Sequence, residues 1–378
     1  SPVNSLAQAG SSVTAVVSTL SEPYYAYTWW PVKDGDVGVP GDNSDKATLD
    51  ITVTAPNNFK VAANGLLQSV TPLSGNRNEY HWSSAYPIVT YLVSFAATNY
   101  TTWSTTYTYP GGTMPVEFYI YPENDSPSYR AGWEKVTDMM AVYRPLFGEY
   151  PFVNEKYGLY NFPFGGGMEH QTMTGQSGSS ESLTSHELSH QWWGDAVTCK
   201  TWSDIWLNEG FATYGEALWI EFKFGVSDPI GYFNTMQSRK PSSVGDSVYI
   251  PGPATADPNR IFSSTFSYRK AAWVLHQLRH IVGDATFFQI LANYRAAFEG
   301  KAASTEDFEV SASATYGQDL SWFFDQCVYA IGAPAYRFGS DSIEIDGQRY
   351  LHFRVEQTQQ ASYPNVFTMP VDVVVAAT

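Results

Sequence analysis

The chain has 378 residues, of which 43% are hydrophobic and 15% are charged. This length predicts two or three domains, and the composition excludes a disordered chain. No apolar run approaches the roughly 20 residues that span a bilayer, so we expect no membrane insertion. The net charge of -16 excludes a nucleic-acid binder that relies on clustered Lys and Arg. It suits a cationic ligand, although acidity is also a common route to solubility.

The first part of the chain has the pattern of β-strands. The segments ATLDITVTA and IVTYLVSFAA are rich in Val, Ile, Thr and Tyr, and they alternate or run apolar. Asn64 and Gly65 between them form a dipeptide typical of turns. We therefore expect an N-terminal β domain over residues 1–105.

Helical spacing then replaces this pattern. SYRAGWEKVTDMMAVYRPLFGEY places apolar residues three and four apart, and NEKYGLYNFPF predicts a strand that enters a glycine cluster. Helical periodicity dominates from Ser182 to Ala330. Alternation returns in IEIDGQRYLHFRVEQTQ and FTMPVDVVV, which predict strands. The expected fold is α+β, with a mainly helical domain over 106–332 and a small β module over 333–378.

The motif HELSH places two histidines four residues apart in a predicted helix. His186 and His190 would project from one face, as two ligands of one zinc ion require. Glu187 would point beside the metal, where a general base for a zinc-activated water must stand. A zinc hydrolase needs a third protein ligand, and Glu209 in NEGFATYGEALWIEF is the candidate. The sequence therefore predicts a hydrolytic zinc site.

Other histidines and acids near this motif are weaker candidates. His276 and His280 in HQLRH have the same spacing, but Gln277 replaces the carboxylate, so we interpret them as structural. Glu216 lies seven residues beyond Glu209, on nearly the same helix face. It is a candidate partner of a zinc-binding histidine, and an exposed role is equally compatible with the sequence.

The motifs HELSHQWWGD and WLNEGFATYGE resemble those of the gluzincin zinc aminopeptidases, the family of aminopeptidase N, tricorn-interacting factor and leukotriene hydrolase. GGGMEH, with Gly167, Met168 and Glu169, is similar to the exopeptidase motif of that family. FSYRKAAWVLHQL resembles the segment that holds its catalytic tyrosine, here Tyr268. LSEPYYAYTWWPVKD resembles a further segment and makes Glu22 the counterpart of a second amine-binding acid.

The resemblance implies a thermolysin-like catalytic domain that holds Zn and removes single residues from peptide N-termini. Glu187 would act as the general base and Tyr268 would stabilise the oxyanion. Glu169 and Glu22 would bind the free amine of the peptide, while Met168 and Gly167 would contact the substrate. The chain departs from the family at His170, where the motif has asparagine. Set against the family, we expect the sequence to start within the N-terminal β domain, to stop within the third β module, and to lack the C-terminal helical domain.

Two alternatives remain open at this level. HELSH with Glu209 does not determine where a peptide is cut, so a gluzincin endopeptidase or a dipeptide-releasing peptidase would carry the same motif. A catalytically silent peptide-binding module would keep the same fold. Abundant Ser, Thr, Tyr and Trp with little Lys favours a secreted or periplasmic protein over a cytoplasmic one.

Overall fold

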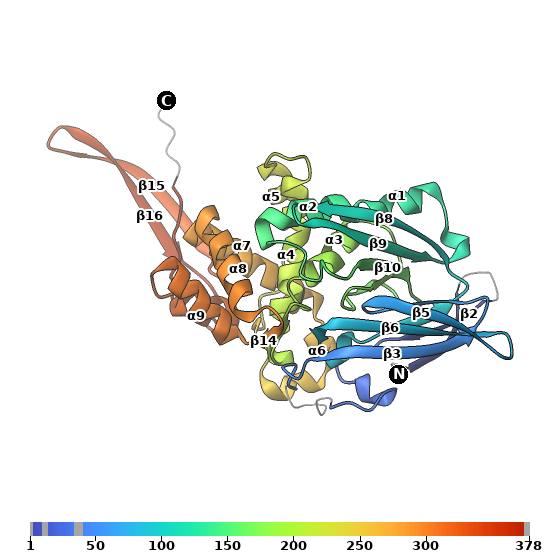
Figure 1. The fold of residues 1–378 in the computed structure, drawn as a ribbon. Coiled ribbons are helices and arrows are strands. Elements are labelled where there is room, and N and C mark those ends of the chain that lie inside the picture. The colour runs from blue at the N-terminus through green and yellow to red at the C-terminus, as the bar shows by residue number, and fades with distance from the viewer. Residues whose placement is uncertain (1–2, 10–13, 34–40, 374–378) are drawn as a thin grey trace.

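A computed structural model describes residues 3–9, 14–33 and 41–373 of the chain (Figure 1). Two antiparallel sheets form its N-terminal part. The first has the order β1-β2-β7-β4 and the second the order β3-β6-β5. Their strands are β1 (Val3–Ala9), β2 (Thr14–Thr19), β3 (Ala47–Pro56), β4 (Lys60–Ala63), β5 (Leu66–Leu73), β6 (Arg77–Ile88) and β7 (Phe95–Thr98).

Alternating burial explains why the first segments form strands. In β6 the buried residues Tyr80, Trp82 and Ser84 stand at every second position, so one face of the strand packs against the core. The expected turn at Asn64 and Gly65 joins β4 to β5, and the φ of Gly65 is 74°. The β character predicted for this part of the chain is present.

A five-stranded sheet lies above these two in Figure 1 and has the order β11-β12-β10-β9-β8. Its strand β10 is the strand predicted in NEKYGLYNFPF. The domain boundary predicted at residue 105 falls inside β8, and the division of the chain into domains stays a prediction. The strands are β8 (Thr101–Tyr109), β9 (Gly112–Ile120), β10 (Tyr157–Asn161), β11 (Gly167–Met168) and β12 (Thr174–Gln176), with helices α1 (Pro127–Glu134) and α2 (Val136–Phe147) beside them.

Helices dominate the next part, as the sequence predicted. They are α3 (Glu181–His190), α4 (Trp206–Phe222), α5 (Pro229–Ser238), α6 (Pro258–Ile261), α7 (Ala271–Val282), α8 (Asp284–Phe298), α9 (Thr305–Tyr316) and α10 (Ser321–Phe324). A π-helical segment, Ser264–Lys270, precedes α7, and another, Asp325–Tyr329, follows α10. Strands β13 (Val197–Cys199) and β14 (Lys301–Ala303) pair in parallel among the helices.

Helix α4 is the central helix of this part, and α3 packs closely against it. At Gly215 of α4, a side chain would meet Oγ of Ser189 on α3 at 2.1 Å, so only glycine permits this approach. The close packing brings the acids of α4 next to the histidines of α3. None of the helices in the described residues is long and apolar enough to cross a membrane.

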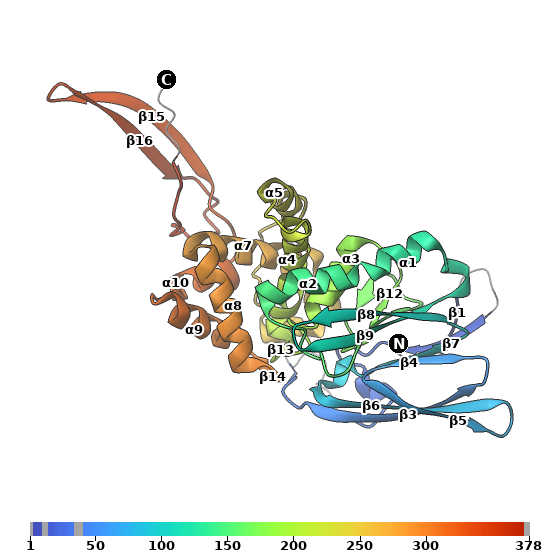
Figure 2. The same cartoon turned by 45° about the horizontal axis from the view of Figure 1, so that its top comes forward.

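The C-terminal part is a hairpin of β15 (Tyr336–Ile345) and β16 (Gln348–Gln357), which projects away from the helices (Figure 2). The strand predicted in FTMPVDVVV is wrong for residues 367–373, which have no regular secondary structure, and its last two residues lie outside the described part of the chain. Side-chain hydrogen bonds hold the start of this segment instead: Gln357 pairs with both backbone groups of Phe367, and Gln326 with both of Thr368.

Candidate active site

Helix α3 carries three of the residues singled out in the sequence. It begins after Ser180, whose Oγ accepts a hydrogen bond from the backbone N–H of Leu183 at 3.3 Å. His186 and His190 stand one turn apart, with ring centroids 4.8 Å from each other. Their side chains are only 12% and 1% exposed, which excludes a helix with two surface histidines.

The carboxylate of Glu209, from α4, completes a triangle with these imidazoles. The two Nε2 atoms are 3.2 Å apart, and each lies 3.3 Å from Oε2 of Glu209. Zinc binds such atoms at about 2.0–2.1 Å, and a regular tetrahedron of that radius has edges of about 3.3–3.4 Å. The three atoms therefore fit three corners of a tetrahedral zinc site. The fourth corner is left for water, as in catalytic zinc sites.

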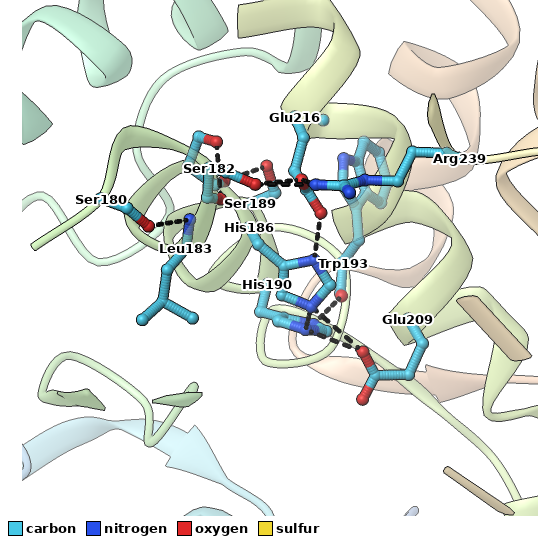
Figure 3. A network of polar contacts seen from close by, with 12 residues as sticks. Ser180, Ser182, Leu183, His186, Ser189, His190, Trp193, Glu209, Glu216 and Arg239 are labelled. Atoms are coloured by element: carbon cyan, nitrogen blue, oxygen red, sulfur yellow. Dashed lines mark hydrogen bonds and ion pairs between the residues drawn. The ribbon is translucent and has the colours of Figure 1, made fainter. Parts of the chain in front are cut away.

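The charges of these groups also suit a metal. Burial favours the neutral carboxyl, but the neighbouring imidazoles, chiefly that of His190, lower the pKa of Glu209 to about 2. Nδ1 of His186 contacts Oε1 of Glu216 at 3.1 Å, and Nδ1 of His190 contacts the carbonyl of Trp193 at 3.2 Å (Figure 3). These contacts favour a proton on Nδ1 and leave Nε2 free to bind a metal.

The carboxylate of Glu187 faces Gly167 of the strand β11, and one of its oxygens lies within 4.8 Å of a ring nitrogen of His190 and of a Glu169 oxygen. Its Oε2 is buried without a hydrogen-bond partner among the described residues. A Cβ built on Gly167 would lie 2.2 Å from Oε1 of Glu187, so the carboxylate occupies the space that a side chain would need. Burial, the largest effect, raises the pKa of Glu187 to about 8. Glu187 is thus a buried carboxylate beside the triangle of ligand atoms, and its role as the general base stays a prediction.

Tyr268 reaches the same place from the π-helical segment before α7. Its ring stacks on that of His186, with centroids 5.9 Å apart and planes 11° apart. Burial raises the pKa of Tyr268 well above its usual value, and the carboxylate of Glu209 adds to this shift. The hydroxyl therefore remains a hydrogen-bond donor at neutral pH.

Glu22 and Glu169 bring two further acids to the site from distant parts of the chain. Glu22 follows β2, and Glu169 follows β11 directly. One carboxylate oxygen from each lies within 4.8 Å of the other and of a Glu209 oxygen. In both residues Oε1 is buried without a hydrogen-bond partner among the described residues, and Oε1 of Glu169 lies 3.8 Å from Nδ1 of His190. Burial raises the pKa of both carboxyls, and for Glu22 the charge of Glu169 is the next largest cause.

A cavity of about 450 Å³ collects these groups. It is lined by the candidate residues Glu22, Gly167, Glu169, His186, Glu187, His190, Glu209 and Tyr268. Met168 is the exception: its side chain is buried in the hydrophobic core and is not among the lining residues, so its predicted substrate contact stays a prediction. His276 contacts Tyr232 and His280 contacts Asp372, both away from this cavity.

Three residues that support the site escaped the sequence interpretation. Arg239, after α5, and Ser182 both bond the second carboxylate oxygen of Glu216 (Figure 3). Gln191 follows the second histidine and holds the backbone beside Glu169, because its Nε2 donates to the carbonyl of Glu169 at 3.1 Å. The contact to Arg239 spans 23 residues and has no sequence signal. Gln191 lies within HELSHQWWGD, but the helical spacing in that motif assigns a function only to the two histidines and Glu187.

This chain is similar to a known peptidase domain and to known aminopeptidases. Residues 166–327 match the peptidase family M1 domain. Probable aminopeptidase 1 of Sulfurisphaera tokodaii is 30% identical over 196 residues, which are 50% of this chain and 25% of that protein. Leucine aminopeptidase 2 of Aspergillus terreus is 28% identical over 324 residues, 76% of this chain and 49% of that protein. The chain thus spans half or less of the length of these two relatives.

Solved structures agree with this match. The M1 zinc metallopeptidase of Deinococcus radiodurans has a TM-score of 0.72 and 26% identity, over 87% of this chain and 72% of that chain. A mutant from the same organism, bound to a Tyr-Ser-Ala substrate, has a TM-score of 0.70 and 25% identity, over 84% of this chain and 69% of that chain. The predicted α+β fold and the resemblance to gluzincin aminopeptidases are confirmed: residues 166–327 match the peptidase family M1 domain, and the chain is similar to M1 zinc metallopeptidases over most of its length.

Proposed function

We propose that the chain is a zinc aminopeptidase, which hydrolyses the first peptide bond of substrates with a free N-terminus. His186, His190 and Glu209 would hold the zinc. The observation that carries the exopeptidase part is the pair of buried carboxylate oxygens of Glu22 and Glu169, which lack a hydrogen-bond partner among the described residues. An ammonium group is the peptide feature that two such acids would bind.

Bound zinc would supply Lewis acidity, which polarises the scissile carbonyl and lowers the pKa of the attacking water. Glu187 accepts the proton of that water and passes it to the leaving amine. Burial raises the pKa of this carboxylate, so it is a stronger base than an exposed one. Tyr268 donates its hydroxyl proton in a hydrogen bond to the developing oxyanion, and its raised pKa keeps it protonated.

The acid pair also accounts for the position of the cut. When the ammonium of the substrate lies between Glu22 and Glu169, the first peptide bond is the one that reaches Glu187. An internal bond brings no positive charge, and two buried acids would stay uncompensated, which is unfavourable. The mutant of the M1 zinc metallopeptidase from Deinococcus radiodurans is bound to a Tyr-Ser-Ala substrate, which supports a peptide as the substrate of this chain.

A direct test compares peptides that differ only at the amino group. The zinc-loaded protein should release the first residue of a free peptide and leave its N-acetylated form intact, and chelation should abolish the activity. Glu169→Gln, which keeps the shape and removes the charge, should raise KM and lower kcat together. Glu306→Gln, at an exposed position of α9, is the matched control and should change neither constant.

The results also separate the alternatives. Cleavage of acetylated peptides at internal bonds would contradict the aminopeptidase proposal and favour the endopeptidase. Release of dipeptides would indicate the dipeptide-releasing peptidase. Stoichiometric zinc without turnover of any peptide would favour the silent binding module.

A further inference from the structure

The backbone that follows Glu169 is an unusual buried segment, which we call the amine arm (residues 169–173). Thr172 in this segment has a φ of 62°, in the left-handed region that residues other than glycine rarely adopt. The side chain of Thr172 is fully buried. Such a conformation persists only where surrounding contacts determine it, and functional sites are where these conformations collect.

The side chain of Gln191, the residue directly after α3, holds one side of the amine arm. The side-chain oxygen of Gln191 accepts the backbone N–H of Thr172 at 2.9 Å, and its Nε2 donates to the carbonyl of Glu169. The hydroxyl of Tyr150 donates to the same oxygen of Gln191 at 3.1 Å. The position of Glu169 relative to His190 is therefore fixed through the residue next to that histidine.

Groups of the N-terminal part hold the other side. Asn64 Nδ2 donates to the carbonyl of Gln171 at 2.7 Å, and the backbone N–H of Gly65 donates to Oγ1 of Thr172 at 2.8 Å. Both donors belong to the turn after β4. A one-residue shift of this turn would break both contacts, so the turn and the amine arm are in a fixed register.

Lys156 joins the two sides. Its side chain is fully buried, and its Nζ donates to the carbonyl of Ala63 at 3.0 Å and to the carbonyl of Thr172 at 3.1 Å. The ammonium also lies 5.3 Å from the centre of the Trp82 ring. Burying an ammonium against neutral carbonyls is unfavourable for stability. A neutral residue would fill this place at less cost, and it would not bridge the two carbonyls.

The hydrogen bonds of Lys156 also connect the amine arm to the sheet that precedes Glu22. Ala63 ends β4, and β4 belongs to the same sheet as β2, with β7 between them. Glu22 lies three residues beyond the end of β2. One sheet thus leads into the segment that carries Glu22, and through Lys156 it also holds the amine arm with Glu169.

We propose that Lys156 is a positioning residue for substrate binding: it ties the amine arm to the N-terminal sheet and so sets the separation of the Glu22 and Glu169 carboxylates that receive the ammonium. This inference rests on the proposed function, because it presupposes that the two acids bind the amine. Lys156 itself does not line the cavity. Its effect should therefore fall on amine recognition and leave zinc binding intact.

The test uses two zinc-binding probes that differ only in the amino group, L-leucine hydroxamate and 4-methylpentanohydroxamate. Their dissociation constants are measured by calorimetry on the zinc-loaded protein. We expect the wild type to bind the amino compound more tightly. In Lys156→Met this preference should shrink by about tenfold or more, while zinc content and affinity for the compound without the amine stay the same. Lys60→Met, at an exposed position of β4, is the control and should keep the wild-type preference.

Each other outcome has a distinct meaning. Equal binding of both probes by the wild type would contradict the proposed function itself. An unchanged preference in Lys156→Met, or an equal loss for both probes, would overturn the positioning role. If Lys156→Met does not fold, Thr172→Gly replaces it, because glycine accepts the positive φ and removes the hydroxyl that bonds Gly65. That variant should also show a smaller preference, and a wild-type preference would overturn the inference.

Discussion

Replacing Gly167 by alanine should impair catalysis without removing the zinc. The new Cβ would lie 2.2 Å from Oε1, 2.4 Å from Cδ and 2.6 Å from Cγ of Glu187. Ordinary contacts of a methyl group with such atoms are about 3.4 Å or longer, so the carboxylate or β11 must move by roughly 1 Å. A displacement of about 1 Å at a catalytic group lowers the rate on the order of 10²-fold. The three proposed zinc ligands are not displaced, so the metal should remain.

The assay measures kcat/KM on an aminoacyl chromogenic substrate, together with zinc content and Tm. Gly339→Ala, in β15 and away from the cavity, is the control, because no atom lies within 4 Å of a Cβ at that exposed glycine and its φ is not positive. The control should keep wild-type kcat/KM. A Gly167→Ala protein with normal zinc and kcat/KM within about twofold of the wild type would refute the reasoning, because Glu187 would then be free to move or would not be the base.

Four further changes test other parts of the site. Glu187→Ala should keep one zinc by metal analysis while kcat falls about 10²–10⁴-fold; loss of the metal would show that Glu187 is a ligand. Tyr268→Phe should lower kcat by roughly 10²–10³ with zinc retained, and a near-normal kcat would make the tyrosine a packing residue. Glu216→Ala should weaken zinc affinity about 10–100-fold in a chelator competition, and an unchanged affinity would refute its role on His186. Burial lowers the pKa of Lys156 to about 8, so above that pH the unfolded chain binds more protons than the folded one. From about pH 8 to 10 the wild type should therefore gain on the order of 1 kcal/mol of unfolding free energy per pH unit relative to Lys156→Met in urea titrations; a constant difference would contradict the shift.

The convergence of His186, His190 and Glu209 was predictable because it depends mainly on residues that lie close together in the sequence. His186 and His190 lie one helical turn apart, and any helix brings them to one face. Glu209 required one more step, the packing of α4 against α3, which the helical period of its segment suggested. The sequence could not show why α3 and α4 pack so closely. The close approach depends on Gly215, and only the structure shows that Ser189 of α3 lies opposite this glycine.

Other parts of the structure depend on contacts between distant segments, which no periodicity reveals. The strand predicted in FTMPVDVVV is an example: its residues alternate like a strand, but the side chain of Gln357 takes up both backbone groups of Phe367. The contact between Lys156 and Ala63 spans 93 residues. From the sequence alone, Lys156 is one basic residue among 21, and only the fold shows that it is buried.

Several features of the site are unfavourable for stability when taken one at a time. Glu22 and Glu169 each have a buried carboxylate oxygen without a hydrogen-bond partner among the described residues, Thr172 has a positive φ, and Lys156 is a buried cation. A protein selected for stability alone would replace each of them, since buried unpaired charges and strained backbone destabilise the folded state. The proposed function accounts for them together, because two acids at a fixed separation would bind a positive charge. Under that proposal a free amino terminus would supply the charge, and the features that lower stability would give the site its selectivity for chain ends.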